Sequence, residues 1–206
     1  MSHVTSPGLF VSLEGGDGAG KSTQAHKLRD WLVAAGREVV LTREPGGTQL
    51  GRTLRDAVLH GEDVDARTEA LLYATDRAHH VASLVRPALE RGAVVVTDRY
   101  LDSSVAYQGS GRDLGADEVE RLSMWATGGL LPALTVLLDL DPVEGQRRLT
   151  GAPDRLERAG DDFHRRTRQA FLDRAAADPA RWLVLDASRG PDELATAVRA
   201  RVEGLL

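Results

Sequence analysis

LFVSLEGGDGAGKST, residues 9–23, combines a strand pattern with a glycine-rich loop. Its first six residues form a nearly continuous apolar run, which is typical of a parallel strand covered on both faces. Residues 15–22 match the phosphate-binding pattern G-x-x-x-x-G-K-[ST], placed between that strand and an expected helix as the pattern requires. The alternative is an ordinary glycine-rich turn with an exposed lysine. The stretch therefore predicts an α/β domain that binds a nucleotide.

Short apolar runs alternate with helical patterns along the rest of the chain. The expected strands are 9–14, 38–42, 93–97, 134–140 and 182–186, and the expected helices are 21–35, 50–59, 66–90, 117–127, 142–149, 161–177 and 191–204. This alternation predicts a three-layer α/β fold, in which helices cover both faces of a five-stranded parallel sheet. No repeat or linker interrupts the chain, so we expect a single domain over 1–206. Ligands of such folds bind beyond the carboxyl ends of the strands.

Composition narrows the class of function. The chain has 206 residues, 42% of them hydrophobic, and a net charge of −5, which suits a folded domain and disfavours binding to a nucleic acid backbone. It has no cysteine, which excludes disulfides and thiolate chemistry. The apolar runs are too short to span a membrane, and residues 1–8 lack the pattern of a signal peptide. We therefore expect a cytoplasmic protein with no membrane or nucleic acid partner.

The glycine-rich loop predicts an ATP site. Its backbone N–H groups and the start of the following helix attract phosphate oxygens. Lys21 is expected to reach the β- and γ-phosphates as a catalytic cation, and Ser22 to bind the Mg²⁺ that accompanies ATP. The predicted ATP-binding residues are Gly15, Gly16, Asp17, Gly18, Ala19, Gly20, Lys21, Ser22 and Thr23.

Charged residues also follow two other expected strands. Asp98 follows the strand 93–97, where an acid of this fold binds Mg²⁺, although it could simply cap a loop. Arg99 beside it, and Arg43 after the strand 38–42, are placed to hold an acceptor phosphate through their planar guanidinium groups.

An arginine-rich segment over roughly 147–160 predicts a flexible lid. The sequence GAP at 151–153 interrupts the helix that begins at 142, and arginines lie on both sides of the break. A lid of this kind excludes water and stabilises charge in the transition state. The alternative is that these arginines form a solvated surface.

Several segments together resemble the bacterial thymidylate kinase (dTMP kinase) family over nearly the whole chain. They are FVSLEG at 10–15 leading into the glycine-rich loop, REPGGT at 43–48, DRA at 76–78, DRYLDSSVAYQG at 98–109, DRLE at 154–157 and DAS at 186–188. The resemblance implies a P-loop nucleoside-monophosphate-kinase fold, ATP and Mg²⁺, dTMP as the acceptor, and a homodimer.

The resemblance also assigns acceptor residues. It implies that Arg43 and Arg99 hold the dTMP phosphate, and that Asp17 approaches the sugar 3′-OH. It also implies that Tyr107 crowds the 2′ position of the sugar, and that Pro45 of the REPGGT segment belongs to the same site.

The base of the acceptor is assigned to two helical faces. The resemblance implies that Tyr73 stacks on the base, that Arg77 binds the thymine O4, and that Ser104 or Gln108 reads the base edge. Spacing supports this, because Tyr73 and Arg77 lie four residues apart on one helix. The alternative for Tyr73 is a core aromatic, since it lies among apolar residues.

The catalytic arginine is expected in the lid. Gly18 has no side chain, whereas the eukaryotic branch of the family has an arginine in this loop. Arg155, just after the break in the helix, is the first choice, and Arg148, before the break, is the second. Both could instead be ordinary surface arginines.

The sequence predicts a dTMP kinase that works by direct in-line phosphoryl transfer. The alternative enzyme is another nucleoside monophosphate or deoxynucleoside kinase of the same fold. A P-loop switch or ATPase is the non-kinase alternative, and the lack of an N-K-x-D guanine-specificity motif counts against a GTPase switch.

Overall fold

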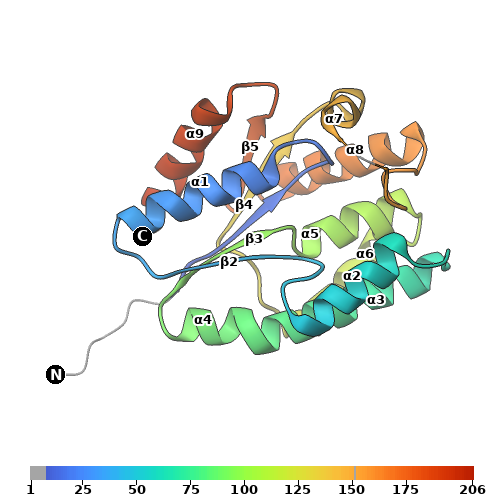
Figure 1. The fold of residues 1–206 in the computed structure, drawn as a ribbon, viewed down its shortest axis with the longest axis horizontal. Helices are drawn as coiled ribbons and strands as arrows, with labels where there is room; N and C mark the ends of the chain where they lie inside the picture. The colour runs from blue at the N-terminus through green and yellow to red at the C-terminus, as the bar shows by residue number, and fades with distance from the viewer. Residues whose placement is uncertain (1–7, 151) are drawn as a thin grey trace.

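The computed structural model describes residues 8–150 and 152–206. Residues 1–7, in the segment tested for a signal peptide, and Gly151 of the expected lid break lie outside the described residues. The five strands form one parallel sheet in the order β2-β3-β1-β4-β5 (Figure 1). They are β1 (Phe10–Glu14), β2 (Val39–Arg43), β3 (Val94–Asp98), β4 (Leu134–Asp139) and β5 (Trp182–Asp186). This confirms the predicted α/β class and every expected strand to within one residue at each end.

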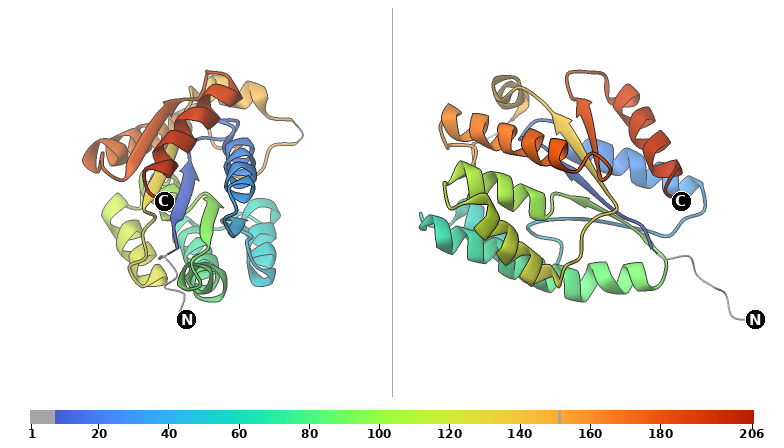
Figure 2. Two further views of the ribbon diagram at one scale, coloured as in Figure 1. Left: turned by 90° about the vertical axis from the view of Figure 1, so that its left-hand side faces the viewer. Right: turned by 180° about the vertical axis from the view of Figure 1, so that it is seen from behind.

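Helices cover both faces of the sheet, which gives the predicted three layers (Figures 1 and 2). One face carries α1 (Lys21–Ala34) and α9 (Pro191–Glu203), which contact each other. The other face carries α3 (Ala66–His80), α4 (Arg86–Glu90), α5 (Leu101–Ser104), α6 (Ala116–Thr127) and α8 (Asp161–Ala177). At the periphery, α2 (Gln49–His60) packs on α3, and α7 (Pro142–Arg148) packs on α8.

The strands bury side chains on both faces. Val11 and Leu13 of β1 pack with Leu28 and Leu32 of α1, whereas Phe10 points to the other side and packs with Tyr100. This two-sided burial is why the strands read as continuous apolar runs rather than alternating ones. In the part of the chain that the structure describes, no helix is long and apolar enough to cross a bilayer.

The expected helix over 66–90 contains a wider turn. A π-helical segment, η1 (Val81–Val85), joins α3 to α4. Pro87 lies in the first turn of α4, and because proline has no backbone N–H, the regular hydrogen bond to residue 83 cannot form there. A second π-helical segment, η2 (Val105–Gly111), continues α5.

Candidate active site

The glycine-rich loop lies between β1 and α1, and its shape depends on glycine. Gly15, Gly18 and Gly20 all have positive φ angles, of 136°, 75° and 93°. A Cβ atom on Gly18 would also collide with the carbonyl oxygen of Gly145 in α7. Because the backbone of α7 closes over the loop at this point, no side chain fits at residue 18, and any arginine at the transferring phosphoryl group must come from elsewhere.

Lys21 and Ser22 begin α1, and Asp98 at the end of β3 lies beside them. The ammonium of Lys21 donates to the carbonyl oxygens of Gly15 (3.1 Å) and Gly16 (2.7 Å). Burial, with a smaller effect of the nearby Arg99 cation, lowers the pKa of Lys21 to about 8. The Ser22 hydroxyl donates to Asp98 Oδ2 at 2.6 Å. A phosphate held by this loop would add negative charge beside the buried lysine and favour its charged form.

The Ser22–Asp98 pair fits a Mg²⁺ ion that is held mainly by nucleotide phosphates. A hydroxyl and a carboxylate this close offer two hard oxygen ligands, which Mg²⁺ prefers. Among residues 8–150 and 152–206, no cluster of three or more His, Cys, Asp or Glu side chains could hold a metal unaided. The donor set therefore matches a metal that arrives with ATP.

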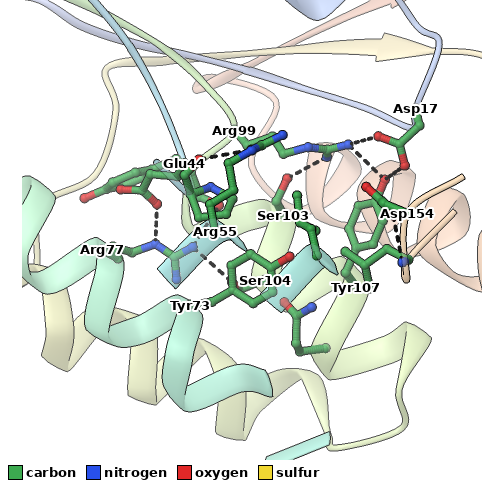
Figure 3. Close-up of a pocket in the computed structure, with 15 residues that line it drawn as sticks. Asp17, Glu44, Arg55, Tyr73, Arg77, Arg99, Ser103, Ser104, Tyr107 and Asp154 are labelled. Atoms are coloured by element: carbon green, nitrogen blue, oxygen red, sulfur yellow. Dashed lines mark hydrogen bonds and ion pairs between the residues drawn. The ribbon is translucent and has the colours of Figure 1, made fainter. Parts of the chain in front are cut away.

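A second cavity lies beside the loop, between α2, α3, α5 and η2 (Figure 3). Its lining combines aromatic side chains with a few charged and polar ones, as in pockets that bind small ligands. Every predicted acceptor residue except Arg43 lines it, namely Asp17, Pro45, Tyr73, Arg77, Arg99, Ser104, Tyr107 and Gln108. Arg43 lines the cavity around the glycine-rich loop instead. The two helical faces inferred from spacing do converge on one pocket.

Arg99 lies where the two cavities meet. Its guanidinium donates to Asp17, to the hydroxyls of Tyr107 (3.1 Å) and Ser103 (3.0 Å), and to the Gly15 carbonyl oxygen (3.1 Å). Burial alone would lower the pKa of Arg99, but the nearby Tyr107 and Asp17 raise it. In turn, although burial pushes the pKa of Asp17 upward, Arg99 and Lys21 hold it below its ordinary value. A fixed cation therefore lies between the loop and the second cavity.

Arg77 forms the floor of the second cavity and is completely buried. Its Nε donates to Glu44 Oε2 at 2.8 Å, and its Nη2 donates to Ser104 Oγ at 2.9 Å. The other oxygen of Glu44 lies 2.8 Å from Nδ1 of the buried His80. Arg77 also donates from Nη1 to Ser123 Oγ (3.1 Å) and from Nη2 to the Tyr100 carbonyl oxygen (3.3 Å), so its guanidinium has a fixed orientation in the cavity lining (Figure 3).

Glu14 anchors the segment that carries Arg99. Its carboxyl group is inaccessible to solvent and accepts from the backbone N–H of Tyr100 (2.8 Å) and the hydroxyl of Ser103. Burial, reinforced by the neighbouring Asp102, raises the pKa of Glu14 to about 8. Because Arg99 itself has a positive φ of 68°, these contacts hold a backbone shape that an arginine rarely adopts.

The two candidate lid arginines differ in their surroundings, because Arg148 lines a cavity whereas Arg155 is buried against Glu69 of α3. Arg148, at the end of α7, lines the cavity around the glycine-rich loop and donates to the Ala187 carbonyl oxygen at 3.0 Å. Arg155 is buried, with its Nη2 atom 2.9 Å from Glu69 Oε2. Its neighbours Asp154 and Leu156 line the second cavity. The segment after the helix break thus forms a wall of the second cavity.

Several residues that line the second cavity were not predicted from the sequence. Glu44, Arg55, Leu59, Tyr100, Ser103, Asp154 and Leu156 also line the cavity. Glu44 lies in the REPGGT segment and Asp154 in the DRLE segment, so their place in these segments could have identified them as site residues. Arg55 gave no signal, because an arginine on a peripheral helix resembles any surface arginine; its Nη1 atom donates to the Pro45 carbonyl oxygen at 3.0 Å.

Comparison with known proteins agrees with this geometry. The family model described as thymidylate kinase matches residues 13–198. The chain belongs to the thymidylate kinase family. Thymidylate kinase from Leifsonia xyli subsp. xyli is 60% identical over 202 residues, which cover 96% of each chain. The Deinococcus radiodurans thymidylate kinase is 53% identical over 200 residues, covering 96% of this chain and 97% of its own.

A solved structure of the same family shares the fold. The crystal structure of thymidylate kinase from Ehrlichia chaffeensis superposes with a TM-score of 0.81 at 28% identity, covering 96% of this chain and all of that one. The resemblance drawn from the sequence segments is confirmed, and so is the enzyme class, that of a phosphotransferase. The roles of single site residues remain predictions.

Proposed function

We propose that this thymidylate kinase family member transfers the γ-phosphoryl group of ATP to dTMP, giving ADP and dTDP. The observation that carries the proposal is that the two cavities adjoin. Both are lined by Asp17, Glu44, Arg55 and Arg99. A phosphate bound by the loop and a second phosphate held by Arg99 would then lie close enough for direct transfer.

The loop end binds ATP in this proposal. Residues 15–23 hold its phosphates, with Lys21 near the β- and γ-phosphates. Ser22 and Asp98 hold Mg²⁺, which neutralises phosphate charge when it is bound. Arg43, which lines the same cavity, holds the acceptor phosphate together with Arg99 in this proposal.

The second cavity binds dTMP. Tyr73 stacks on the base, Arg77 donates toward the thymine O4, and Ser104 and Gln108 complete the base edge. Arg99 holds the phosphate. Tyr107 and Asp17, whose side chains lie 3.3 Å apart, contact the sugar and leave little room for a 2′-hydroxyl.

The reaction needs no covalent enzyme intermediate. An oxygen of the dTMP phosphate, already anionic near neutral pH, attacks the γ-phosphorus as the bond to the β-γ bridging oxygen breaks and ADP leaves. Catalysis is then positioning and charge stabilisation by Lys21, Arg99 and a lid arginine. We place the reaction in the cytoplasm, where ATP and nucleotide precursors meet.

We also propose a homodimer formed through α3 and α6. Leu71 and Leu122 line one shallow groove between these helices, and Leu71 is 55% exposed. Trp125, one turn beyond Leu122, is 82% exposed. Apolar side chains this exposed on adjoining helices suit a second copy of the chain. Light scattering should give a dimer for the wild type and a monomer for Trp125→Glu; a wild-type monomer would contradict the proposal.

The test of the function is acceptor-dependent ADP release. Initial rates are measured with dTMP, dUMP, dCMP, AMP and thymidine at fixed ATP and Mg²⁺, and the product is identified by chromatography. We expect dTMP to give the highest kcat/KM and dTDP as the product. A higher kcat/KM for AMP or thymidine would identify another kinase of this fold, and acceptor-independent hydrolysis would identify an ATPase.

A further inference from the structure

Glu69 of α3 lies behind the base end of the second cavity and does not line it. Only 1% of the residue is exposed. One carboxylate oxygen, Oε1, accepts from the side-chain amide of Gln108 at 2.9 Å. The other, Oε2, lies 3.2 Å from an Nη atom of Arg112 and 2.9 Å from one of Arg155. A buried acid thus joins a side chain of the base pocket to two arginines.

This contact determines which end of the Gln108 amide faces the cavity. An ionised carboxylate only accepts hydrogen bonds, so the NH₂ group of Gln108 must point at Glu69. The amide oxygen then points away from Glu69, and Gln108 is one of the residues that line the cavity. Among the described residues, the hydrogen bonds of the Gln108 side chain involve only its nitrogen, which leaves the oxygen for a ligand.

The polarity of that amide distinguishes pyrimidines. Thymine presents an acceptor at O4 and a donor at N3–H, whereas cytosine presents a donor at N4 and an acceptor at N3. A cavity with a donor from Arg77 and an acceptor from Gln108 complements thymine at both atoms. It opposes cytosine at both atoms, donor to donor and acceptor to acceptor, and such unpaired buried groups give strong discrimination.

We infer that Glu69 is a positioning residue that sets the polarity of Gln108 and so makes the pocket select thymine over cytosine. This inference rests on the proposed function, because it concerns the base of the proposed acceptor. Glu69 does not touch the substrate. It acts through the orientation of one amide, which would otherwise turn over to suit either base.

The decisive variant is Glu69→Gln, which keeps the size of the side chain. Two arginine Nη atoms approach the Oε2 position, at 2.9 and 3.2 Å, and only a 3.4 Å contact from Arg112 Nε joins Gln108 at the Oε1 position. The oxygen of the new amide is therefore held by the arginines, and its NH₂ group faces Gln108. Gln108 must then turn over and present its own NH₂ group to the base.

The measured quantity is the ratio of kcat/KM for dTMP to that for dCMP. In E69Q this ratio should fall by about 10-fold or more, with KM for dTMP raised and KM for ATP unchanged. In E69Q, kcat/KM for dUMP should fall in parallel with kcat/KM for dTMP, because uracil and thymine share the same hydrogen-bonding edge. A merely structural role would weaken all three acceptors alike and leave the ratio unchanged.

Two further variants distinguish the effect of the Gln108 amide from a general effect of charge near the pocket. Arg112→Gln removes a donor from the same carboxylate without touching Gln108, and it should leave the ratio near the wild-type value. Gln108→Met removes the amide. In the Q108M background, E69Q should change the ratio no further, because the two residues act through one contact.

An unchanged ratio in E69Q with a wild-type unfolding temperature would overturn the inference. So would an equal change of the ratio in the Q108M background, or an equal fall in R112Q. If E69Q does not fold, Q108M alone decides, since undiminished preference for dTMP in that variant would exclude Gln108 as the reader. A wild type without any preference for dTMP would instead contradict the proposed function.

Discussion

The loop that binds phosphates and the pocket that binds the base are built in opposite ways. The loop is one run of residues, 15–23, and it offers mainly backbone groups and the Lys21 ammonium. The base pocket takes side chains from α2, α3, α5, η2 and the segment after α7. Two buried carboxylates, Glu44 in its lining and Glu69 behind it, hold the groups that face the ligand.

This difference separates rate from recognition. Substitutions in the loop remove charge stabilisation from the transferring group and should lower kcat. Substitutions in the base pocket remove donors or acceptors that the ground state and the transition state both use, and should raise KM for dTMP. Substitutions at both ends of the site test that division.

Lys21→Ala should lower kcat by on the order of 10² to 10³ or more, because it removes the cation nearest the transferring phosphoryl group. The unfolding temperature should stay at or above that of the wild type, since burial lowers the pKa of Lys21 and removing this charge relieves its desolvation. Steady-state rates and thermal unfolding measure both effects. A kcat near that of the wild type would exclude this loop as the catalytic site.

The sequence predicted the loop well because its information is local. Glycines at 15, 18 and 20 and the lysine at 21 must follow one another for the loop to form, so one segment contains the whole motif. The strands were predicted equally well, because burial on both faces makes each of them a short apolar run. The π-helical turn at 81–85 was not predicted, because the whole stretch 66–90, including Pro87, has the pattern of one long helix.

The base pocket was predicted only where one helix carries several of its residues. Tyr73 and Arg77 share a face through their spacing, but nothing in the sequence shows that Glu44, itself held by His80, fixes the orientation of Arg77. Contacts such as that between Glu69 and Arg155, which are 86 positions apart along the chain, arise only from the fold. From the sequence, Arg155 was the first candidate for the catalytic lid arginine, and nothing in the sequence indicated that it contacts Glu69 of α3.

The two lid arginines should differ in what they change. Arg148→Ala should lower kcat by on the order of 10² with little effect on KM, because Arg148 lines the cavity around the loop. Arg155→Ala should mainly raise KM for dTMP and lower the unfolding temperature, since Arg155 pairs with the buried Glu69. The reverse pattern would show that the lid rearranges to bring Arg155 to the phosphates, as the sequence alone favoured.

Arg77→Ala should raise KM for dTMP by about 10- to 100-fold, the effect of one lost charge-assisted hydrogen bond, and leave KM for ATP unchanged. The ratio of kcat/KM for dTMP to that for dCMP should also fall in this variant. The unfolding temperature should fall as well, because Glu44 loses a buried partner. Arg77→Lys serves as the control for charge, and unchanged KM and selectivity in R77A would count against a role in reading the base.

Stability of the ligand-free protein should decline as pH rises from about 5 to 8. The pKa of Glu14 rises from its ordinary value of 4.5 to about 8 in the folded chain. The native state therefore binds a proton that the unfolded state has lost, and this stabilisation is full below the unfolded pKa and disappears as pH rises through the folded one. The slope for one proton is about 1.4 kcal/mol per pH unit.

Glu14→Gln should flatten that decline, because the amide does not titrate. Denaturant unfolding at pH 5, 6, 7 and 8 for both proteins measures the difference. A wild-type slope equal to that of E14Q would mean that Glu14 does not carry the extra proton.

Calorimetric titration of dTMP and of dCMP into the wild-type protein without ATP tests most directly the claim that the second cavity reads the base by itself. The Kd for dTMP should be lower than that for dCMP by about 10²-fold or more, and Lys21→Ala should bind dTMP as the wild type does. Equal Kd values for the two nucleotides, or loss of dTMP binding in K21A, would contradict the division of the site into a phosphate end and a base-reading end.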